Sequence, residues 1–251
     1  MLIDAVEELS ATAAAGLTHL PDTATSLIFR LTTTGRADLL VAGPRTRAAY
    51  FSGKDLPVCV RARLRPGVAR AALGMPITEL VDRVVPLTDV WHPADASHLE
   101  HRLSTLDGDP ALIAEQLDAA LRAKLVAQST HSPDSSPNVR FSNDARLVHA
   151  AAHDLASARP TRLPDLAHRL AISERRLRSL FTENAGLPPK VFTRINRLRA
   201  ALTKGSSERL AQLAATTGYY DQSHMTADFR AMLGVSPAAF FAGRLPTPST
   251  C

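Results

Sequence analysis

The chain has 251 residues, of which 45% are hydrophobic and 21% charged, and its formal net charge is +5. This composition allows a sizeable core and excludes a wholly disordered chain. No apolar run approaches the roughly 20 residues that cross a bilayer, and the acidic N-terminus is unlike a secretory signal.

Four short runs in the first part of the chain predict β-strands. They are rich in β-branched residues or alternate between apolar and polar ones, and Gly or Pro residues separate them. The clearest alternation is in PVCVRARLRP, where apolar residues alternate with Cys59 and three arginines, as in a half-buried strand. The four runs span residues 26–34, 37–43, 48–53 and 57–64. We expect them to form a small antiparallel sheet.

Helical patterns follow this sheet. They span residues 68–73 with 77–84, then 95–106, then 110–127. The third has an apolar stripe, which consists of Leu112, Ile113, Leu117, Leu121 and Leu125. This stripe either covers the sheet or pairs with a partner helix. Residues 1–127 therefore predict an α+β domain, a small antiparallel sheet plus helices, with a sensing or self-associating role. A small-molecule effector and a second copy of the chain are its candidate partners.

Patterns typical of catalysis are missing from this half of the sequence. It has no nucleophile with a base at motif spacing, no glycine-rich phosphate loop and no set of metal ligands. His98 and His101, like His149 and His153, have ligand-like spacings but no Cys or carboxylate set beside them. Cys59 and the terminal cysteine are too far apart for a disulfide framework, which fits the cytoplasm. We expect no enzyme activity, cofactor or metal.

Residues 128–142, rich in Ser and Pro, predict an exposed linker. The charge balance changes at about the same place. Residues 140–251 contain 16 Lys and Arg against 8 Asp and Glu, a net of +8, whereas residues 1–139 contain 13 against 16, a net of −3. A basic half joined to a mildly acidic one suggests that the basic half meets a polyanion.

The second half repeats one pattern after 48 residues. The matched pairs are Phe181 and Phe229, Gly186 and Gly234, Pro189 and Pro237, and Phe192 and Phe240. Such a repeat indicates one supersecondary unit built twice. Each unit is a short helix, a tight turn and a second helix. The predicted helices span residues 163–170 and 174–184 in the first unit, and 209–216 and 222–233 in the second.

The second helix of each unit is amphipathic, with apolar residues at helical spacing on one side and polar residues on the other. Two helices joined by a short turn, with the second presenting Arg, Ser, Gln and His, form a helix-turn-helix that can enter the DNA major groove. The alternative is a solvated face on a purely structural helix pair. A helix over PKVFTRINRLRAALTKG would hold the units together, and its Lys190, Arg194 and Arg197 are placed for phosphates.

These features resemble the DNA-binding domain of AraC/XylS-type transcription regulators. The resemblance lies in LAHRLAISERRLRSLFTENAGLPP, in RINRLRAAL and above all in GYYDQSHMTADFRAMLGVSP. It implies an all-α domain over residues 143–244 with two helix-turn-helix units that read adjacent major grooves, followed by a tail at 245–251. It also implies a bacterial regulator at the nucleoid, an activator or a repressor, with RNA polymerase as a further candidate partner.

By position, the resemblance assigns base-reading residues to both units. They are Arg175, Arg178 and Ser179 in the first unit, and Gln222, Ser223, His224 and Ala227 in the second. Ser173, Arg176 and Arg230 join the phosphate-contacting candidates, and Asp221 is placed as the N-cap of the second reading helix. The family often has Arg where this chain has Ala227, and an alanine cannot hydrogen-bond a base, so we expect weaker specification by the second unit.

Two other functions remain open alternatives. One is an architectural protein that binds DNA with little sequence preference, which a competition ratio against random DNA would distinguish. The other is a DNA-repair enzyme fused to this domain, which needs a cysteine methyl acceptor in a zinc-bound or Pro-Cys-His setting. Cys59, in PVCVRAR, matches neither setting.

Overall fold

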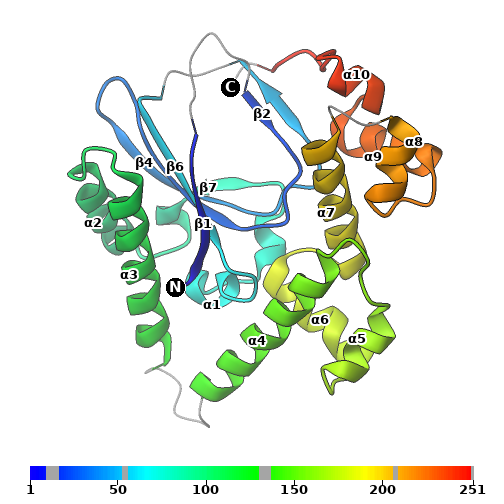
Figure 1. Ribbon diagram of the computed structural model, residues 1–251. Helices are drawn as coiled ribbons and strands as arrows, with labels where there is room; N and C mark the ends of the chain where they lie inside the picture. Colours follow the sequence, from blue (N-terminus) through cyan, green and yellow to red (C-terminus); the bar gives the residue numbers. More distant parts are fainter. Residues whose placement is uncertain (10–16, 53–55, 130–136, 206–208, 250–251) are drawn as a thin grey trace.

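The computed structural model describes residues 1–9, 17–52, 56–129, 137–205 and 209–249. A sheet with flanking helices forms the N-terminal part, and the part after it is helical (Figure 1). This arrangement confirms the predicted fold class. The predicted domain boundaries themselves stay predictions.

The main sheet has five antiparallel strands in the order β1-β6-β3-β4-β7. These are β1 (Ile3–Glu8), β3 (Ser26–Leu31), β4 (Ala37–Ala42), β6 (Val58–Leu64) and β7 (Val84–Pro86). β2 (Leu17–His19) and β5 (Ala49–Phe51) pair as a separate ribbon. All four predicted runs form strands, but β5 pairs with β2 and lies outside the main sheet, so the expectation of one sheet from all four is wrong at this strand. β1, β2 and β7 were not predicted.

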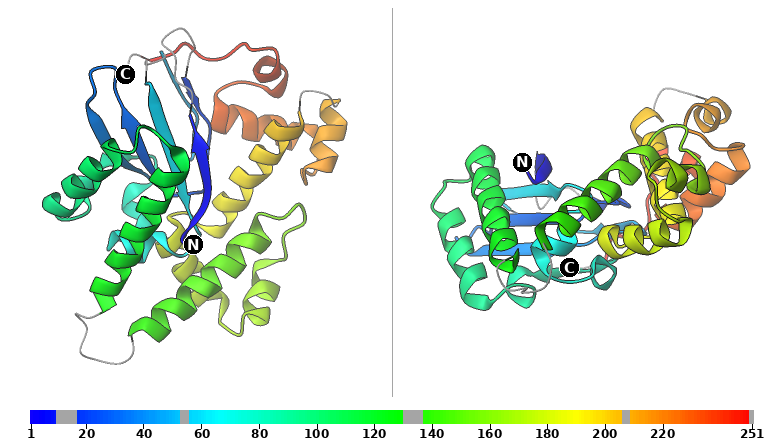
Figure 2. Two further views of the ribbon diagram at one scale, coloured as in Figure 1. Left: turned by 60° about the vertical axis from the view of Figure 1, so that its left-hand side comes forward. Right: turned by 90° about the horizontal axis from the view of Figure 1, so that it is seen from below.

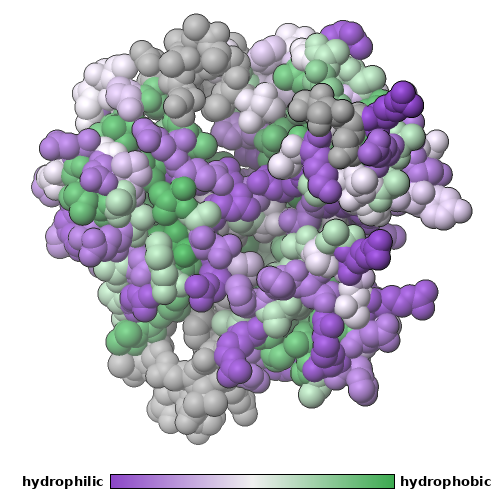
Figure 3. Space-filling view, in the orientation of Figure 1, coloured by the Kyte–Doolittle hydropathy of each residue, from purple (hydrophilic) through white to green (hydrophobic). Residues whose placement is uncertain are grey.

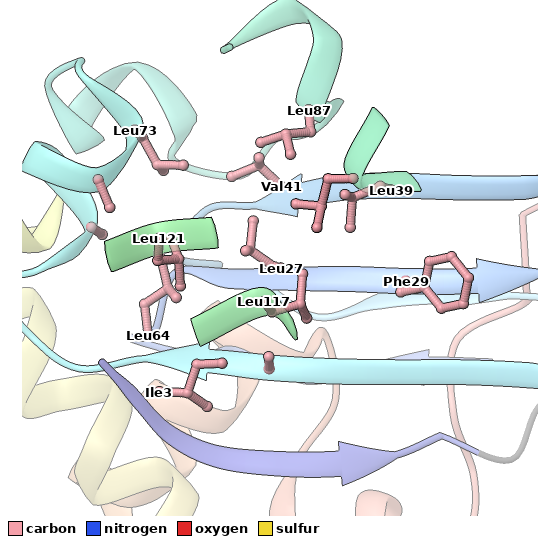
Figure 4. Packing of buried hydrophobic residues seen from close by; sticks show 14 of the residues in the cluster. Ile3, Leu27, Phe29, Leu39, Val41, Leu64, Leu73, Leu87, Leu117 and Leu121 are labelled. Atoms are coloured by element: carbon pink, nitrogen blue, oxygen red, sulfur yellow. The ribbon is translucent and has the colours of Figure 1, made fainter. Parts of the chain in front are cut away.

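One face of the sheet is covered by helices. They are α1 (Ala69–Leu73), α2 (Pro93–Ser104) and α3 (Pro110–Ser129). Figure 4 shows Leu117 and Leu121 of α3 among the aliphatic side chains of the strands. Ile113, Leu117 and Leu121 are fully buried, while Leu112 is 46% exposed. The stripe on this helix therefore covers the sheet, the first of the two alternatives.

The helix predicted over residues 77–84 is largely wrong. Only a 3-10 turn forms, η1 (Ile77–Leu80), and the chain then enters β7, which pairs with β4. A second 3-10 turn, η2 (Leu87–Asp89), follows directly. β-branched Val84 and Val85 favour an extended backbone, and Pro86 restricts the residue before it to that conformation. These local preferences override the weak helical spacing.

Helices make up the remainder of the chain. They are α4 (Pro137–Leu155), α5 (Leu163–Arg169), α6 (Glu174–Ala185), α7 (Pro189–Lys204), α8 (Leu210–Thr216), α9 (Gln222–Leu233) and α10 (Pro237–Phe241). α4 begins at Pro137, so the last residues of the predicted linker are helical, and 130–136 lie outside the described residues. α4 to α10 enclose a second hydrophobic core.

The N-terminal region (residues 1–129) contacts this helical part at several places (Figures 1 and 2). α6 packs against η1 and α1. The ribbon meets the end of α9, where the Ala48 amide donates to the Met232 carbonyl at 2.7 Å. Arg199 of α7 donates to the Pro21 carbonyl at 3.2 Å and lies 3.5 Å from Asp22, which Arg63 also holds. The helical part is thus anchored to the N-terminal region at α6, α7 and α9.

Candidate nucleic-acid interface

The two predicted helix-turn-helix units have the same internal geometry. The first consists of α5 and α6, and the second of α8 and α9. α6 ends at Gly186 and α9 at Gly234, both left-handed with φ of 77°. Glycine reaches this conformation without strain, which explains why both copies have it. The repeated aromatic pairs also match: Phe181 meets Phe192 edge-on, and Phe229 meets Phe240 in the same way. The repeat predicted from sequence is confirmed.

Each second helix begins with a side-chain cap. Ser173 accepts a hydrogen bond from the Arg176 amide at 3.2 Å, and Asp221 accepts one from the His224 amide at 2.7 Å. Both caps satisfy an amide that the first turn leaves unpaired. The two caps explain why a short polar residue precedes each of these helices. The predicted cap at Asp221 is confirmed.

All predicted base-reading residues lie on exposed surfaces of α6 and α9. They are Arg175, Arg178 and Ser179 on α6, and Gln222, Ser223, His224 and Ala227 on α9. The opposite sides of both helices are buried in the second core. Hydrophilic side chains project from the side of the molecule that carries α5, α8 and α9 (Figure 3). The exposed faces can therefore meet a ligand without any change in the core.

The reading face of α6 contains charged residues that pair along the helix. Arg178 Nε donates to Glu174 at 2.9 Å, and Ser179 Oγ donates to Glu183 at 3.0 Å. The Arg175 side chain is exposed, and among the side chains that the structure describes it has no ion-pair partner. An exposed i,i+4 pair stabilises by only ~0.3–0.5 kcal/mol, whereas a bidentate contact to guanine discriminates by ~1–3 kcal/mol. Arg178 can therefore leave Glu174 for a base.

The start of α9 packs against the buried aromatic ring of Tyr219. The His224 ring meets the buried ring of Tyr219 edge-on at 5.5 Å, and the Arg197 guanidinium lies 5.0 Å from the same ring. Burial and the neighbouring Asp228 carboxylate raise the pKa of Tyr219 well above its ordinary value. The phenol therefore stays neutral, and His224 and Arg197 are held on a common support.

The predicted phosphate-contacting residues differ in their surroundings. Lys190 and Arg230 are exposed, and Arg176 is paired with Asp144 of α4 at 3.1 Å. Arg194 instead donates to Asp228 at 2.7 Å, and the Asp228 side chain is only 4% exposed. Arg194 thus joins α7 to α9 inside the protein, a role that the sequence interpretation did not include. Its contact with phosphate stays a prediction.

Two further residues at this interface were missed from the sequence. Tyr220, in the turn before α9, is 92% exposed. Asp228 is buried, although the 48-residue shift places it opposite the apolar Leu180. An acid at a core position needs a partner, so the repeat signals that Asp228 has one, although it does not identify Arg194 as that partner. Nothing in the sequence pattern marked Tyr220.

The histidines with ligand-like spacings were not expected to bind a metal. Across residues 1–9, 17–52, 56–129, 137–205 and 209–249, no three His, Cys, Asp or Glu residues group as a metal site. His149 and His153 lie on α4. Cys59 is buried, and burial raises the pKa of its thiol. None of the helices that the structure describes is long and apolar enough to span a bilayer.

Comparisons with known proteins place the similarity in this helical part. Residues 166–243 match the family model of a helix-turn-helix domain. The chain is similar to the DNA-binding domain of AdpA, a global transcriptional factor solved with a target DNA, at 25% identity and a TM-score of 0.35, over 40% of this chain and 91% of that one. No curated protein matches the chain.

Two other solved structures are similar at lower identity. A regulator with an AraC-type DNA-binding domain from Chromobacterium violaceum shares 20% identity, with a TM-score of 0.35, over 43% of this chain and 96% of that one. ToxT from Vibrio cholerae shares 10% identity, with a TM-score of 0.42, over 97% of this chain and 98% of that one.

Proposed function

Since residues 166–243 form an AraC-type helix-turn-helix domain, we propose that this chain is a sequence-specific regulator of transcription. In this proposal α6 and α9 read two adjacent major grooves of double-stranded DNA. One observation supports it above all others. Every predicted base-reading residue is exposed on these two helices, while their opposite sides share one core.

The dimensions of α7 are consistent with this reading mode. It joins the two units, and its 16 residues give a length of roughly 24 Å at ~1.5 Å per residue. This length is of the same order as the ~34 Å between successive major grooves on one face of DNA. The Arg194–Asp228 ion pair ties α7 to the second reading helix. The DNA can therefore meet a preformed pair of helices.

Each group of predicted residues has a separate role in the proposal. The readers on α6 and α9 contact base edges, where Arg pairs with guanine and Gln with adenine. The phosphate-contacting residues position the protein without specifying sequence. These are Ser173, Arg176, Lys190, Arg194, Arg197 and Arg230. Residues 1–127 are the proposed sensing or self-associating part, and RNA polymerase is the proposed partner in transcription.

A competition experiment with the full chain tests sequence specificity. Random DNA duplexes are taken through rounds of selection, and the best duplex then competes against unselected DNA for binding. A specific regulator should prefer the selected duplex by at least ~10³, and its affinity should fall steeply with salt, with a log–log slope of about −0.9 per phosphate contact. Salt-dependent binding with a ratio near one would instead identify an architectural DNA-binding protein.

A further inference from the structure

Glu183 of α6 connects the reading face with the N-terminal region. Its Oε1 accepts the hydrogen bond from Ser179 Oγ at 3.0 Å, and its Oε2 lies 2.8 Å from Nη1 of Arg70 in α1. The Arg70 and Glu183 side chains are 42% and 45% exposed, so the pair lies at the surface. Arg70, which lies 109 positions before Ser179 in the sequence, thus pairs with the Glu183 carboxylate to which Ser179 donates.

Close packing of α6 against α1 and η1 holds Arg70 and Glu183 next to each other. α6 ends at Gly186, which lies against η1: a Cβ on Gly186 would come within 2.8 Å of Ile77 Cγ2 and 3.1 Å of the Ile77 carbonyl oxygen. α1 packs on the same helix. The end of α6 therefore has little freedom to move relative to α1, and the Arg70–Glu183 pair forms from two elements already in place.

The Ser179 hydroxyl has one proton and two lone pairs. With its proton donated to Glu183, it offers a base only acceptor positions. In the major groove, adenine N6 and cytosine N4 are donors, whereas guanine N7 and O6 and thymine O4 are acceptors. We propose that Ser179 and Glu183 together select a base with an amino group in the major groove, adenine or cytosine, at one position of the operator. This inference rests on the proposed function.

Arg70 is a positioning residue in this arrangement. The Glu183 carboxylate lies on a helix that approaches phosphates, and like charges repel. Arg70 neutralises the carboxylate and keeps it turned toward Ser179. Without Arg70, Glu183 turns away and the hydroxyl proton is free to point at a base acceptor. The N-terminal region thereby sets the base preference at a position that it does not touch.

The test is selection from a randomised duplex library with the full chain and its variants. The Ser179→Ala variant identifies the base that Ser179 contacts: it is the operator position at which this variant loses the base preference of the wild type. The wild type should prefer adenine or cytosine there by roughly 10-fold, which lies within the range for one good contact. Glu183→Gln, whose amide can donate to the hydroxyl, should shift the preference toward guanine or thymine, and Arg70→Gln should shift it part of the way.

Arg122→Gln is the matched control. Arg122 is an exposed arginine of the N-terminal region that pairs with Asp118 on α3, so its loss should leave every position unchanged. The inference is overturned if the wild type selects a defined operator but prefers guanine or thymine at that position, or if Glu183→Gln and Arg70→Gln leave the preference as it was. The proposed function survives those results. Failure of the wild type to select any operator overturns both.

Discussion

The two helix-turn-helix units share a framework but differ in the faces that they expose. Both have a side-chain cap, a left-handed glycine and an edge-on aromatic pair at equivalent positions. α6 exposes two arginines and a serine among the predicted readers, and its far end lies on the N-terminal region. α9 exposes Gln222, Ser223, His224 and Ala227, none of them an arginine. The scaffold is thus repeated in the two units, whereas the predicted readers differ.

This difference separates the requirements of folding from those of recognition. Residues that build the framework repeat because each unit must bury the same side of its second helix. Readers are free to diverge because they face solvent. We therefore expect the first unit to carry most of the sequence information, while the second adds affinity and a weaker preference.

The framework itself differs at Asp228, and the largest effect is expected there. Asp228→Asn removes the carboxylate that Arg194 contacts inside the protein. We expect the free energy of unfolding to fall by about 2–3 kcal/mol, since a charged hydrogen-bond partner is lost at a buried site. Urea unfolding followed by helical circular dichroism measures this. Asp165→Asn, at an exposed acid in α5, is the control. A loss below ~0.5 kcal/mol would contradict the structural role of the pair.

The readers should differ in energy between the units. Arg175→Ala is expected to cost roughly 2 kcal/mol on the selected operator and to relax specificity at the base beneath it. Gln222→Ala should cost less, about 1 kcal/mol, with its effect confined to the second half-site. Arg244→Ala, at an exposed arginine that follows α10, controls for loss of charge. The affinity of each variant is measured for the selected operator and for a random duplex, and loss of a base contact should lower only the affinity for the operator. Equal losses on both duplexes would mean that Arg175 contacts phosphate, not a base.

Ala227→Arg should make the second unit more like the first. A base-facing arginine creates a new preference, with guanine favoured by about 1–2 kcal/mol at one position. Added charge alone would tighten binding to every sequence alike. Binding of the variant to a library of second half-sites distinguishes the two outcomes. Preferences that match the wild type at every position would show that residue 227 does not face the groove.

The caps should be equivalent, because they belong to the shared framework. Ser173→Ala and Asp221→Ala are each expected to lower stability by about 1 kcal/mol. Ser173→Asp and Asp221→Ser, which exchange the two cap types, should restore most of it. Thermal unfolding of the four variants provides the comparison. A cost at one cap and none at the other would mean that the second helices do not begin in the same way.

Much of this framework could be predicted from sequence. α9 begins and ends at the predicted residues, and α6 differs by one residue at its end. Strong amphipathic periodicity, a capping residue and a terminal glycine define such helices locally. β1 and β7 gave weaker signals. Five of the six positions of β1, a strand at the sheet edge, are exposed or partly exposed, and β7 has only three residues. Their pairing depends on partners that the local sequence does not encode.

At the candidate interface, too, local features could be predicted from the sequence, whereas contacts between distant residues could not. The seven predicted readers, which the resemblance assigns by position, are all exposed, in agreement with the helical periodicity of the two helices. The contacts of Arg194 with Asp228 and of Arg70 with Glu183 could not be predicted in this way, since they join residues 34 and 113 positions apart. Charged residues on one stripe look alike in a sequence, whether they face phosphates or a buried acid. Only the packing of α7 on α9, and of α1 on α6, distinguishes them.

The central claim is that two units read two adjacent grooves and that the first carries more information. The most direct measurement is the sequence profile of duplexes that the full chain selects from a random library. We expect two blocks of specified bases about one helical turn apart, with the stronger block erased by Arg175→Ala and the weaker one reduced by Gln222→Ala. A single block, or a profile that neither variant changes, would contradict the account.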